Sequence, residues 1–538
     1  MTINIGRKKY AEACMAAVFS FVAAHAYAID IPSENPDISM QWGNTVRYNA
    51  GWRVENRDPV LARSPSNDEG TNSFNRGDMV TNRLDLLSEF DFSYRKQLGF
   101  RISGAAWADA AFHDDVRTGP TLASRGSYFN NQFSNFTKRY HKGLSGELLD
   151  AYVFSNFELG GMPGDVKIGR HSVLWGEAVF LTVNSISHSQ APTDGLKAVT
   201  NPGIDAKELA MPIGQISANL QATPELSLSA QYYFEWRPSR SPEGGTYLAG
   251  TDFLLNGPDR VSPAPGLFLR NGGNIEPSGR GDWGLAARWR PSWLDGTVGV
   301  YYRDFTEKNP SVSLNIPSRI YNPVYPKNIQ LIGMSLSKNL GGISFGSEVS
   351  YRKNQPLVSS ITDGNQEGAR GNTWHLLANA VVAMAPNAIW NSATLIGELG
   401  YSRWDKVTTG QNYFLGCSQR PAGDQGAGTG CVTKDALQAM VRFTPQWLSV
   451  WPGWDVSGLA SYSLGLKGNS AVANNGTKNG GSYSLGATFT YNQRHDFSIS
   501  YNDYRATYEP TASGVTRVTN GTQRQDRGWV VLTYKGSF

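Results

Sequence analysis

The stretch WVVLTYKGSF, residues 529–538, is the strongest indication of the fold. Large apolar residues recur at every second position, among them Leu532 and Tyr534, and polar residues such as Thr533 and Lys535 stand between them. A period of two is that of a β-strand, whose successive side chains point to opposite faces. The sequence therefore predicts a strand with one apolar and one polar face at this end of the chain.

A strand with two different faces suits the last strand of a membrane β-barrel. That strand must pair with the first one, because lipid cannot satisfy the hydrogen bonds of an open sheet edge. The bare aromatic Phe538 also resembles the signal that the outer-membrane assembly machinery reads, although Gly536 stands where that signal usually has a second aromatic residue. We expect that machinery as a partner. The alternative is an ordinary edge strand at a chain end.

The composition fits a barrel better than a helical membrane protein. The 538 residues include 15 Trp, 24 Tyr and 23 Phe, as the aromatic girdles of a barrel require. A mean hydropathy of -0.38 is too polar for a bundle of membrane helices. The formal net charge of +4 leaves no basic excess, so we expect no nucleic-acid partner.

The start of the chain has the pattern of a secretory signal peptide. Basic residues at 7–9 precede an apolar core at 13–24, and Ala26-Tyr27-Ala28 is a cleavage site of small residues. The expected parts of the chain are a signal peptide over 1–28, a periplasmic N-terminal segment over 29–44 and an outer-membrane barrel over 45–538.

Further segments alternate as the last one does. One runs from Leu84 to Tyr94 against a charged face. Short connections rich in Gly, Pro, Asn and Asp alternate with long ones, such as 112–146 and 237–281. Outer-membrane barrels combine short periplasmic turns with long extracellular loops. The sequence therefore predicts an all-β fold, a transmembrane antiparallel β-barrel of about 18 strands.

The polar faces of these strands carry full charges that would point into the lumen. Such charges either select the solute or pair with one another and stabilise the wall, and the residues alone leave both interpretations open. The candidates on the strands for the substrate path are Arg47, Arg83, Asp85, Glu89, Arg101, Arg288 and Arg303.

The connection 175–212 is neither a clean strand nor a polar loop. It begins with an apolar run, Ala178 to Val183, and Pro192 and Pro202 prevent it from joining the wall. We expect this connection to fold into the lumen as an insert that gates the barrel. The alternative is an extracellular loop packed on its neighbours.

The strand before this connection carries a charge on its apolar side. Strict alternation would place Arg170 in lipid, and we expect a bulge at Gly169 to turn it inward. The candidates at the constriction are Arg170, His171, Trp175 and Glu177.

Cys417 and Cys431 are the only cysteines after the expected cleavage site, and they flank a Gly-rich segment. In an oxidising compartment two such cysteines most often pair. We expect a disulfide between them, with two free thiols as the alternative.

Signals of enzymatic chemistry are weak. His171 and Ser172 are adjacent, but neighbours on a strand face opposite ways. The cluster Asn67-Asp68-Glu69-Gly70 could hold calcium, and we interpret it instead as a solvated acidic loop. We expect no enzyme, and therefore no catalytic residue, no cofactor and no resident metal.

Four parts of the sequence carry a family resemblance. They are IPSENPD (31–37), GDMVTNRLDLLSEFD (77–91), Gly169-Arg170-His171 with Trp175-Gly176-Glu177, and PEGGTY (242–247). Together they resemble the proteobacterial outer-membrane proteins grouped as domain of unknown function 1302, over essentially the whole chain. The resemblance implies a transport barrel for hydrophobic compounds. It also implies two partners: a periplasmic protein of lipoprotein-carrier type and an inner-membrane exporter of the resistance-nodulation-division superfamily.

The sequence therefore predicts a barrel that moves a hydrophobic or amphipathic molecule, such as a lipid, fatty acid, sterol or aromatic ester, across the outer membrane of a Gram-negative bacterium. Its surroundings would be the lipid bilayer and lipopolysaccharide. A wide, water-filled lumen would instead favour a substrate-selective porin for small polar or anionic solutes. A buried Ser–His pair facing lipid would favour a lipid hydrolase. A passive structural or adhesive barrel is the remaining alternative.

Overall fold

The computed structural model describes residues 29–64, 67–119, 126–253, 255–264, 266–360, 362–363, 367–420, 425, 427–510, 516–521 and 523–538. The predicted leader, residues 1–28, lies outside the described residues.

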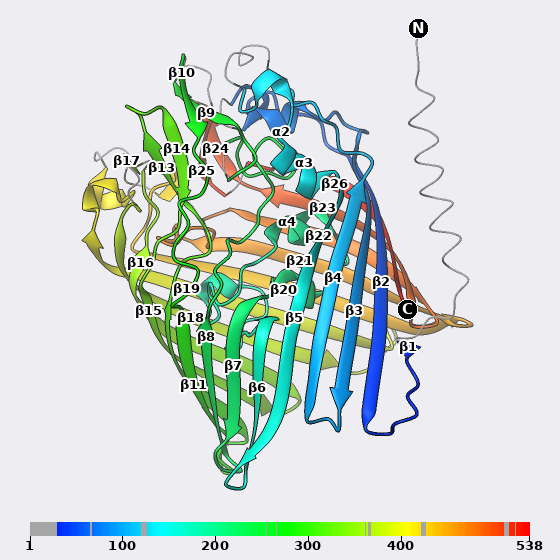
Figure 1. Ribbon diagram of the computed structural model, residues 1–538. Coiled ribbons are helices and arrows are strands. Elements are labelled where there is room, and N and C mark those ends of the chain that lie inside the picture. Colours follow the sequence, from blue (N-terminus) through cyan, green and yellow to red (C-terminus); the bar gives the residue numbers. More distant parts are fainter. Residues whose placement is uncertain are drawn as a thin grey trace.

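Nineteen strands form one antiparallel sheet, and eighteen of them close into a barrel. The remaining strand, β1 (Ile29–Asp30), has two residues and pairs only with β2. The closing pair joins β2 to β26, with Thr45 opposite Ser537 and Arg53 opposite Trp529. Figure 1 shows the closed wall. The prediction of an antiparallel barrel of about 18 strands is confirmed.

The bounds of the wall strands follow chain order. They are β2 (Ile38–Arg53), β3 (Met79–Tyr94), β4 (Leu98–Asp109), β5 (Gly143–Leu159), β6 (Met162–His171), β7 (Ile213–Gln221), β8 (Leu226–Tyr233), β11 (Trp283–Trp289), β12 (Gly296–Phe305), β15 (Ile329–Leu340), β16 (Ile343–Pro356), β18 (Arg370–Met384), β19 (Ser392–Thr409), β20 (Asp435–Trp451), β21 (Trp454–Lys467), β22 (Gly481–Tyr491), β23 (His495–Arg505) and β26 (Trp529–Ser537). The first wall strand thus begins at Ile38, earlier than the expected start at residue 45.

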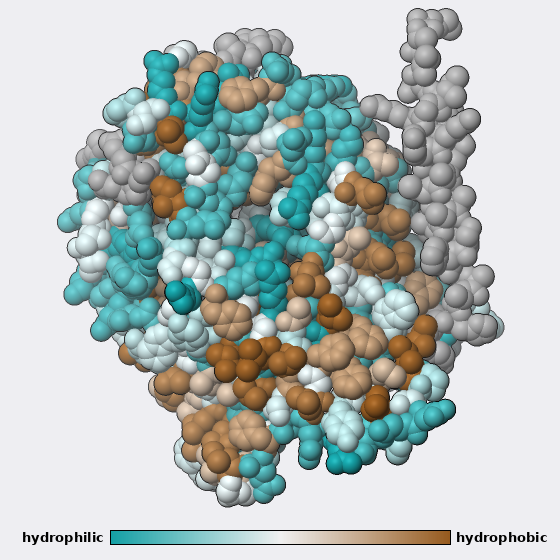
Figure 2. Space-filling model, in the orientation of Figure 1, coloured by the Kyte–Doolittle hydropathy of each residue, from teal (hydrophilic) through white to brown (hydrophobic). Residues whose placement is uncertain are grey.

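The two faces of the wall have opposite character. Leu86, Ile102 and Leu532 are exposed on the outside, whereas Arg47 and Arg83 are buried on the inside. In Figure 2 the apolar residues gather in a belt over the lower part of the visible face, and the upper part is mostly hydrophilic. An apolar outer belt on a closed antiparallel wall is the architecture of an outer-membrane barrel.

Short turns and long connections alternate along the wall, as the sequence predicts. The long connections gather at one end of the barrel (Figure 1) and contain small sheets that alternation did not predict. One sheet joins β9 (Arg260–Ala264), β10 (Leu267–Asn271), β13 (Ser311–Asn315), β14 (Ile320–Val324) and β17 (Thr362–Asp363), and a second joins β24 (Thr507–Pro510) and β25 (Thr516–Asn520).

The helices are short and lie in the long connections. In the described part of the chain, no helix is both long and apolar enough to cross a membrane. The α-helices are α2 (Asp68–Asn72), α3 (Asn135–His141), α4 (Gly195–Thr200) and α5 (Ala206–Leu209), and the 3₁₀ turns are η1 (Leu61–Arg63), η3 (Phe129–Asn131), η4 (Thr182–Asn184), η5 (Gln411–Tyr413), η6 (Cys417–Gln419) and η8 (Ala427–Thr429).

Candidate functional site: the barrel lumen

The connection between β6 and β7, residues 172–212, lies inside the barrel. Its Glu208 pairs with the inward Arg47 of β2 at 2.8 Å. The carbonyl of its Ser185 accepts a hydrogen bond at 2.8 Å from Arg352 of β16, on the other side of the ring of strands. One segment reaches the inner faces of both strands only by occupying the lumen, so the predicted luminal insert is confirmed. We call residues 172–212 the luminal insert.

Apolar side chains fix the first part of the luminal insert against one side of the wall. Trp175 and Ile186 are buried against Ala286 of β11, Tyr301 of β12 and Leu331 of β15. Burying an apolar side chain of this size contributes about 1.5–3 kcal/mol. The apolar start of the insert therefore stabilises its position inside the barrel, on the side of β11 to β15.

Two wall carboxylates satisfy the backbone of the apolar run. Glu348 of β16 accepts the N–H groups of Ala178 (3.0 Å) and Ile186 (2.6 Å). Glu398 of β19 accepts three consecutive N–H groups, ending with that of Leu181 at 2.6 Å. Both glutamates are buried. Buried N–H groups need acceptors, and these carboxylates supply them where the insert forms no regular structure.

Two buried arginines bind carbonyl groups at the end of the apolar run and just after it. Arg303 of β12 donates to the carbonyls of Ile186 (2.7 Å) and His188 (2.8 Å). Arg352 of β16 donates to the carbonyls of Val183 (2.9 Å) and Ser185. Arg303 was predicted as part of the substrate path. The structure places it in the anchoring of the luminal insert.

Glu177 also contacts the wall. Its carboxylate accepts a hydrogen bond from Ser335 of β15 (3.0 Å), and its carbonyl accepts one from Asn379 of β18 (2.6 Å). Its side chain remains partly accessible. The structure thus places both Trp175 and Glu177 against the inner wall, and their role at a constriction stays a prediction.

A cavity of about 470 Å³ lies between the other side of the wall and the two ends of the luminal insert. It has both apolar and charged walls, because inward side chains of β3 to β6 meet the insert there. Its lining includes Leu87, Glu89, Arg101, Ser103, Leu149, Asp150, Tyr152, Lys167, His171, Leu174 and Lys207.

The charges in this cavity are largely paired. Arg101 lies within ion-pair distance of Glu89, of Asp91 at 2.8 Å and of Asp150 at 3.5 Å. Lys207 of the insert pairs with Glu89 at 2.6 Å. Sequence reasoning placed Glu89 and Arg101 in the lumen, and the structure adds that they form one network with an end of the insert.

The environment of Lys167 differs from that of the other two cations in the cavity, Arg101 and Lys207. Its Nζ lies 5.6 Å from the centre of the Tyr152 ring, and no ion pair joins it to a carboxylate among the residues that the structure describes. Sequence reasoning missed Lys167 as a site residue. Alternation with the outward Ile168 would have placed it in the lumen.

The prediction that a bulge turns Arg170 inward is wrong. The pairing of β6 with its neighbours continues without a register shift, and Arg170 stands opposite Ala151 and Gly214. Gly169 adopts a positive φ of 127°, yet the alternation persists and leaves Arg170 on the outer face with Ile168. There it forms two hydrogen bonds with Glu235, at 2.9 and 2.6 Å. Arg170 can stay on the outer face without a bulge, because the ion pair with Glu235 neutralises its charge there.

Three further predicted residues point inward. Arg83 binds Asp85 through both its Nε and Nη2 atoms at 2.9 Å, and Asp85 also accepts a hydrogen bond from Asn201 of the insert at 3.0 Å. Arg288 shares the inner face of β11 with Ala286 and remains partly accessible. Arg83 and Asp85 therefore form a structural pair.

His171 forms a buried pair with a serine that the sequence did not single out. Its Nε2 lies 2.7 Å from the Ser217 hydroxyl, and its Nδ1 lies 3.1 Å from the carbonyl of Gly169. Because that carbonyl only accepts, Nδ1 carries the proton, and Nε2 accepts from Ser217. The pair faces the lumen, whereas the hydrolase alternative requires a pair that faces lipid.

The inner face of β21, β22 and β23 carries mainly hydroxyl groups. Thr488 and Ser498 lie 2.9 Å apart across β22 and β23, and Ser484 donates to Asn502 at 2.6 Å. These inward side chains remain partly accessible, whereas inward side chains under the insert, such as Glu398, are buried. The insert therefore leaves this part of the inner wall uncovered.

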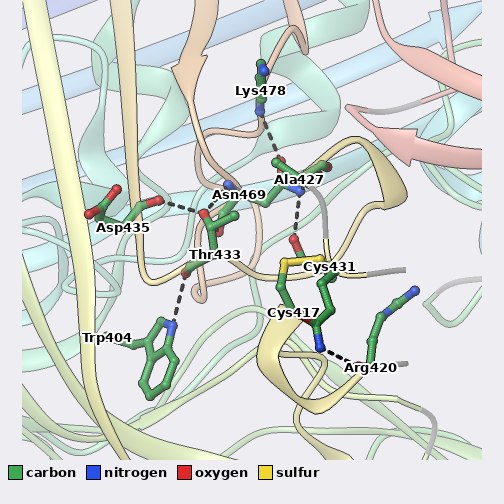
Figure 3. The surroundings of a disulfide bond; sticks show 10 residues. Trp404, Cys417, Arg420, Ala427, Cys431, Thr433, Asp435, Asn469 and Lys478 are labelled. Carbon is green, nitrogen blue, oxygen red and sulfur yellow. Dashed lines mark hydrogen bonds between the residues drawn. A yellow bond between two sulfur atoms is a disulfide. The ribbon is translucent and has the colours of Figure 1, made fainter. Parts of the chain in front are cut away.

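The predicted disulfide between Cys417 and Cys431 is confirmed. Figure 3 shows how it is joined to the neighbouring connection. Asn469 donates to the carbonyls of Cys431 and Ala427, both at 2.8 Å. The disulfide closes a loop within the connection after β19, and the hydrogen bonds of Asn469 hold that loop against the connection after β21.

The acidic cluster after the first wall strand is not a solvated loop. Asp68 and Glu69 lie in α2 and are buried beside Asp252. Burial raises the pKa of Asp68 to about 6, and burial together with the charge of Asp252 raises that of Glu69. No group of three or more metal-ligating side chains occurs in the described residues. The cluster is part of the packed end of the barrel.

Comparison with known proteins gives a family and distant structural relatives. Pseudomonas aeruginosa OpdK, solved with vanillate, is 9% identical, with a TM-score of 0.41 over 93% of this chain and 98% of that one. The outer membrane channel DcaP of Acinetobacter baumannii is 11% identical, with a TM-score of 0.39 over 95% of this chain and 100% of that one. No curated protein matches. The model of the family described as "Protein of unknown function (DUF1302)" matches residues 9–538, so the chain belongs to that family.

Proposed function

We propose that the protein is an outer-membrane channel for hydrophobic or amphipathic molecules, restricted by its luminal insert. The observation that carries this proposal is the cavity of about 470 Å³ beside the insert. Leu87, Leu149 and Leu174 give it an apolar wall, and the Arg101 network gives it a charged one. A cavity with both kinds of wall suits a molecule with an apolar body and a polar head.

Lys167 supports an anionic head. An ammonium group beside the Tyr152 ring is oriented by that ring but not neutralised by it. A carboxylate in the cavity would find a free positive charge at Lys167, whereas Arg101 and Lys207 already have carboxylate partners. We therefore take amphipathic anions such as fatty acids as the leading substrate class.

The contacts of the insert support a fixed restriction. Wall groups on β12, β16 and β19 satisfy its backbone from 177 to 188. Moving that part would break several buried hydrogen bonds together, so passage occurs around it. The periplasmic carrier and the inner-membrane exporter implied by the family resemblance are the partners we propose for delivery to this lumen.

Transport in proteoliposomes tests the proposal. The purified protein should speed the entry of labelled decanoate far more than that of glucose. Lys167→Ala should reduce decanoate entry roughly tenfold by removing one charge-assisted contact, and Lys167→Arg should keep most of it. Equal entry of glucose and decanoate, unaffected by either substitution, would exclude the proposed selectivity.

One observation favours a second candidate, a porin for small polar solutes. The hydroxyl-bearing inner face of β21 to β23 stays accessible beside the insert, and Arg442 of β20 is exposed on the same side. Such a surface can replace the hydrogen bonds that a sugar or a small hydrophilic anion makes with water. Rapid glucose entry with no effect of Lys167→Ala would support this porin.

A further inference from the structure

The outer surface of the wall holds an apolar groove across β12, β15, β16, β18, β19 and β20. It has a volume of about 640 Å³ and extends from Trp293, in the turn before β12, to Leu437, near the start of β20. Its exposed lining includes Met334, Leu336, Leu376 and Leu399. The groove therefore runs obliquely from the end with short turns toward the end with long connections.

Cations gather on the outer face at the second end of this groove. Leu437 stands opposite Lys467 of β21, and Arg403 of β19 stands opposite Asp435. The side chains of Arg403 and Lys467 are 47% and 68% exposed. The Asp435 carboxylate lies between them, 3.8 Å from Arg403 and 3.0 Å from Lys467. One carboxylate cannot neutralise two cations, so a positive charge remains at the surface.

A third cation extends this basic end. Lys434 lies just before β20, with its Nζ 3.7 Å from the centre of the Trp404 ring and 2.7 Å from the carbonyl of Asp405, to which it donates. The proximity of Arg403 and burial both lower the pKa of Lys434, burial more. We call Arg403, Lys434 and Lys467 the basic end of the groove.

We propose that this groove binds one phosphorylated lipid of the outer leaflet, with its acyl chains along the groove and its phosphate at the basic end. Long connections of an outer-membrane barrel are extracellular, which places the basic end at the level of the outer headgroups. Guanidinium and ammonium groups there match a phosphate in charge. A soluble phosphate would use only the cations, whereas a lipid also accounts for the apolar groove that continues from them.

Lipid titration followed by native mass spectrometry tests the site. The full-length mature protein, freed of lipid in detergent, should bind diphosphoryl lipid A more tightly than zwitterionic phosphatidylethanolamine. Replacing Arg403, Lys434 and Lys467 together by Gln should weaken lipid A binding by roughly tenfold or more, since each surface cation adds to the attraction of an anionic lipid. Ala378→Trp, which fills the groove, should weaken the binding of both lipids.

The matched control replaces three cations near the short turns by Gln: Lys96 and Arg290, which are exposed, and Lys338, which is half-buried. It should leave lipid A binding unchanged, and heat-modifiable mobility in gels should verify that every variant is folded. Equal losses in the two triple variants would overturn the site, as would unchanged binding after Ala378→Trp. Displacement of lipid A by inorganic phosphate at equal concentration would assign the cations to a soluble anion instead.

Discussion

The N–H group of Leu181 lies 2.6 Å from a carboxylate oxygen of Glu398. Leu181 belongs to the luminal insert and Glu398 to wall strand β19, and the contact is buried. In a poorly hydrated interior such a charge-assisted hydrogen bond is strong, and its loss leaves a donor without water. The wall and the insert are therefore energetically coupled at this point.

We expect Glu398→Ala to loosen the insert without preventing barrel formation. Three N–H groups lose their acceptor: that of Leu181 is buried, and those of Val179 and Phe180 are partly buried. A buried donor without a partner costs about 1–3 kcal/mol. Hydrogen exchange of residues 179–181 should accelerate strongly, and single-channel conductance should rise. Glu158→Ala, at an exposed position near a short turn, is the matched control. Unchanged exchange at 179–181 would show that these N–H groups do not depend on the carboxylate.

Deleting Phe538 should slow barrel closure. Its backbone N–H donates to the carbonyl of Asn44, and its own carbonyl accepts from the N–H of Asn44, both at 2.7 Å. Loss of both bonds leaves the backbone of Asn44, within β2, unpaired on the side that faces β26, at a net cost of about 1–3 kcal/mol. The fraction of heat-modifiable protein during refolding measures the effect. Phe538→Ala, which keeps the backbone bonds, separates closure from the aromatic signal. Normal refolding of the deletion would contradict the closing role.

Replacing Cys417 and Cys431 together by Ser should destabilise one connection and leave the wall unchanged. The bond closes a loop with a sequence separation of 14, for which the chain-entropy model gives about 3 kcal/mol. Proteolytic cleavage within the connection that follows β19 should become faster, while the melting temperature of the barrel stays the same. Thiol labelling of the unreduced, unfolded parent protein should find no reactive thiol. A lower barrel melting temperature would argue against a local effect.

The packed end of the barrel should become less stable as pH rises. Burial raises the pKa of Glu243 from 4.5 to about 8, against the opposing effect of the hydrogen bond from Gly257 (2.7 Å). The folded state thus retains a proton that the unfolded state releases, so stability falls from about pH 4.5 to about pH 8, by on the order of a few kcal/mol.

Hydrogen exchange around Gly257, corrected for intrinsic pH dependence, measures this loss. Glu243→Gln should reduce the pH dependence of this protection, because an amide does not titrate in this range. The raised pKa values of Asp68 and Glu69 in the same packed end leave a residual dependence. Glu276→Gln, at an exposed position, should keep the dependence of the parent protein. A parent protein equally protected at pH 5 and pH 8 would refute the assignment to Glu243.

The wall of the barrel follows from the sequence alone. Successive side chains of a strand point to opposite faces, so an odd or even position decides whether a side chain faces lipid or the lumen. This alternation can be read from the local sequence. For this reason alternation placed Arg47 and Leu532 correctly and identified the closing strand. The prolines and the apolar run of 175–212 likewise excluded this connection from the wall, because Pro cannot donate to a ladder and apolar side chains avoid water.

The contacts of each luminal charge depend on the folded chain and not on the local sequence. Arg303 was predicted in the substrate path and is buried against insert carbonyls, and Arg170 was predicted inward and pairs with Glu235 outside. Partners more than sixty residues away in sequence set these outcomes, and no local pattern contains them. The environment of Lys167 also depends on folding. Whether a charge is paired depends on the side chains that the folded chain brings beside it.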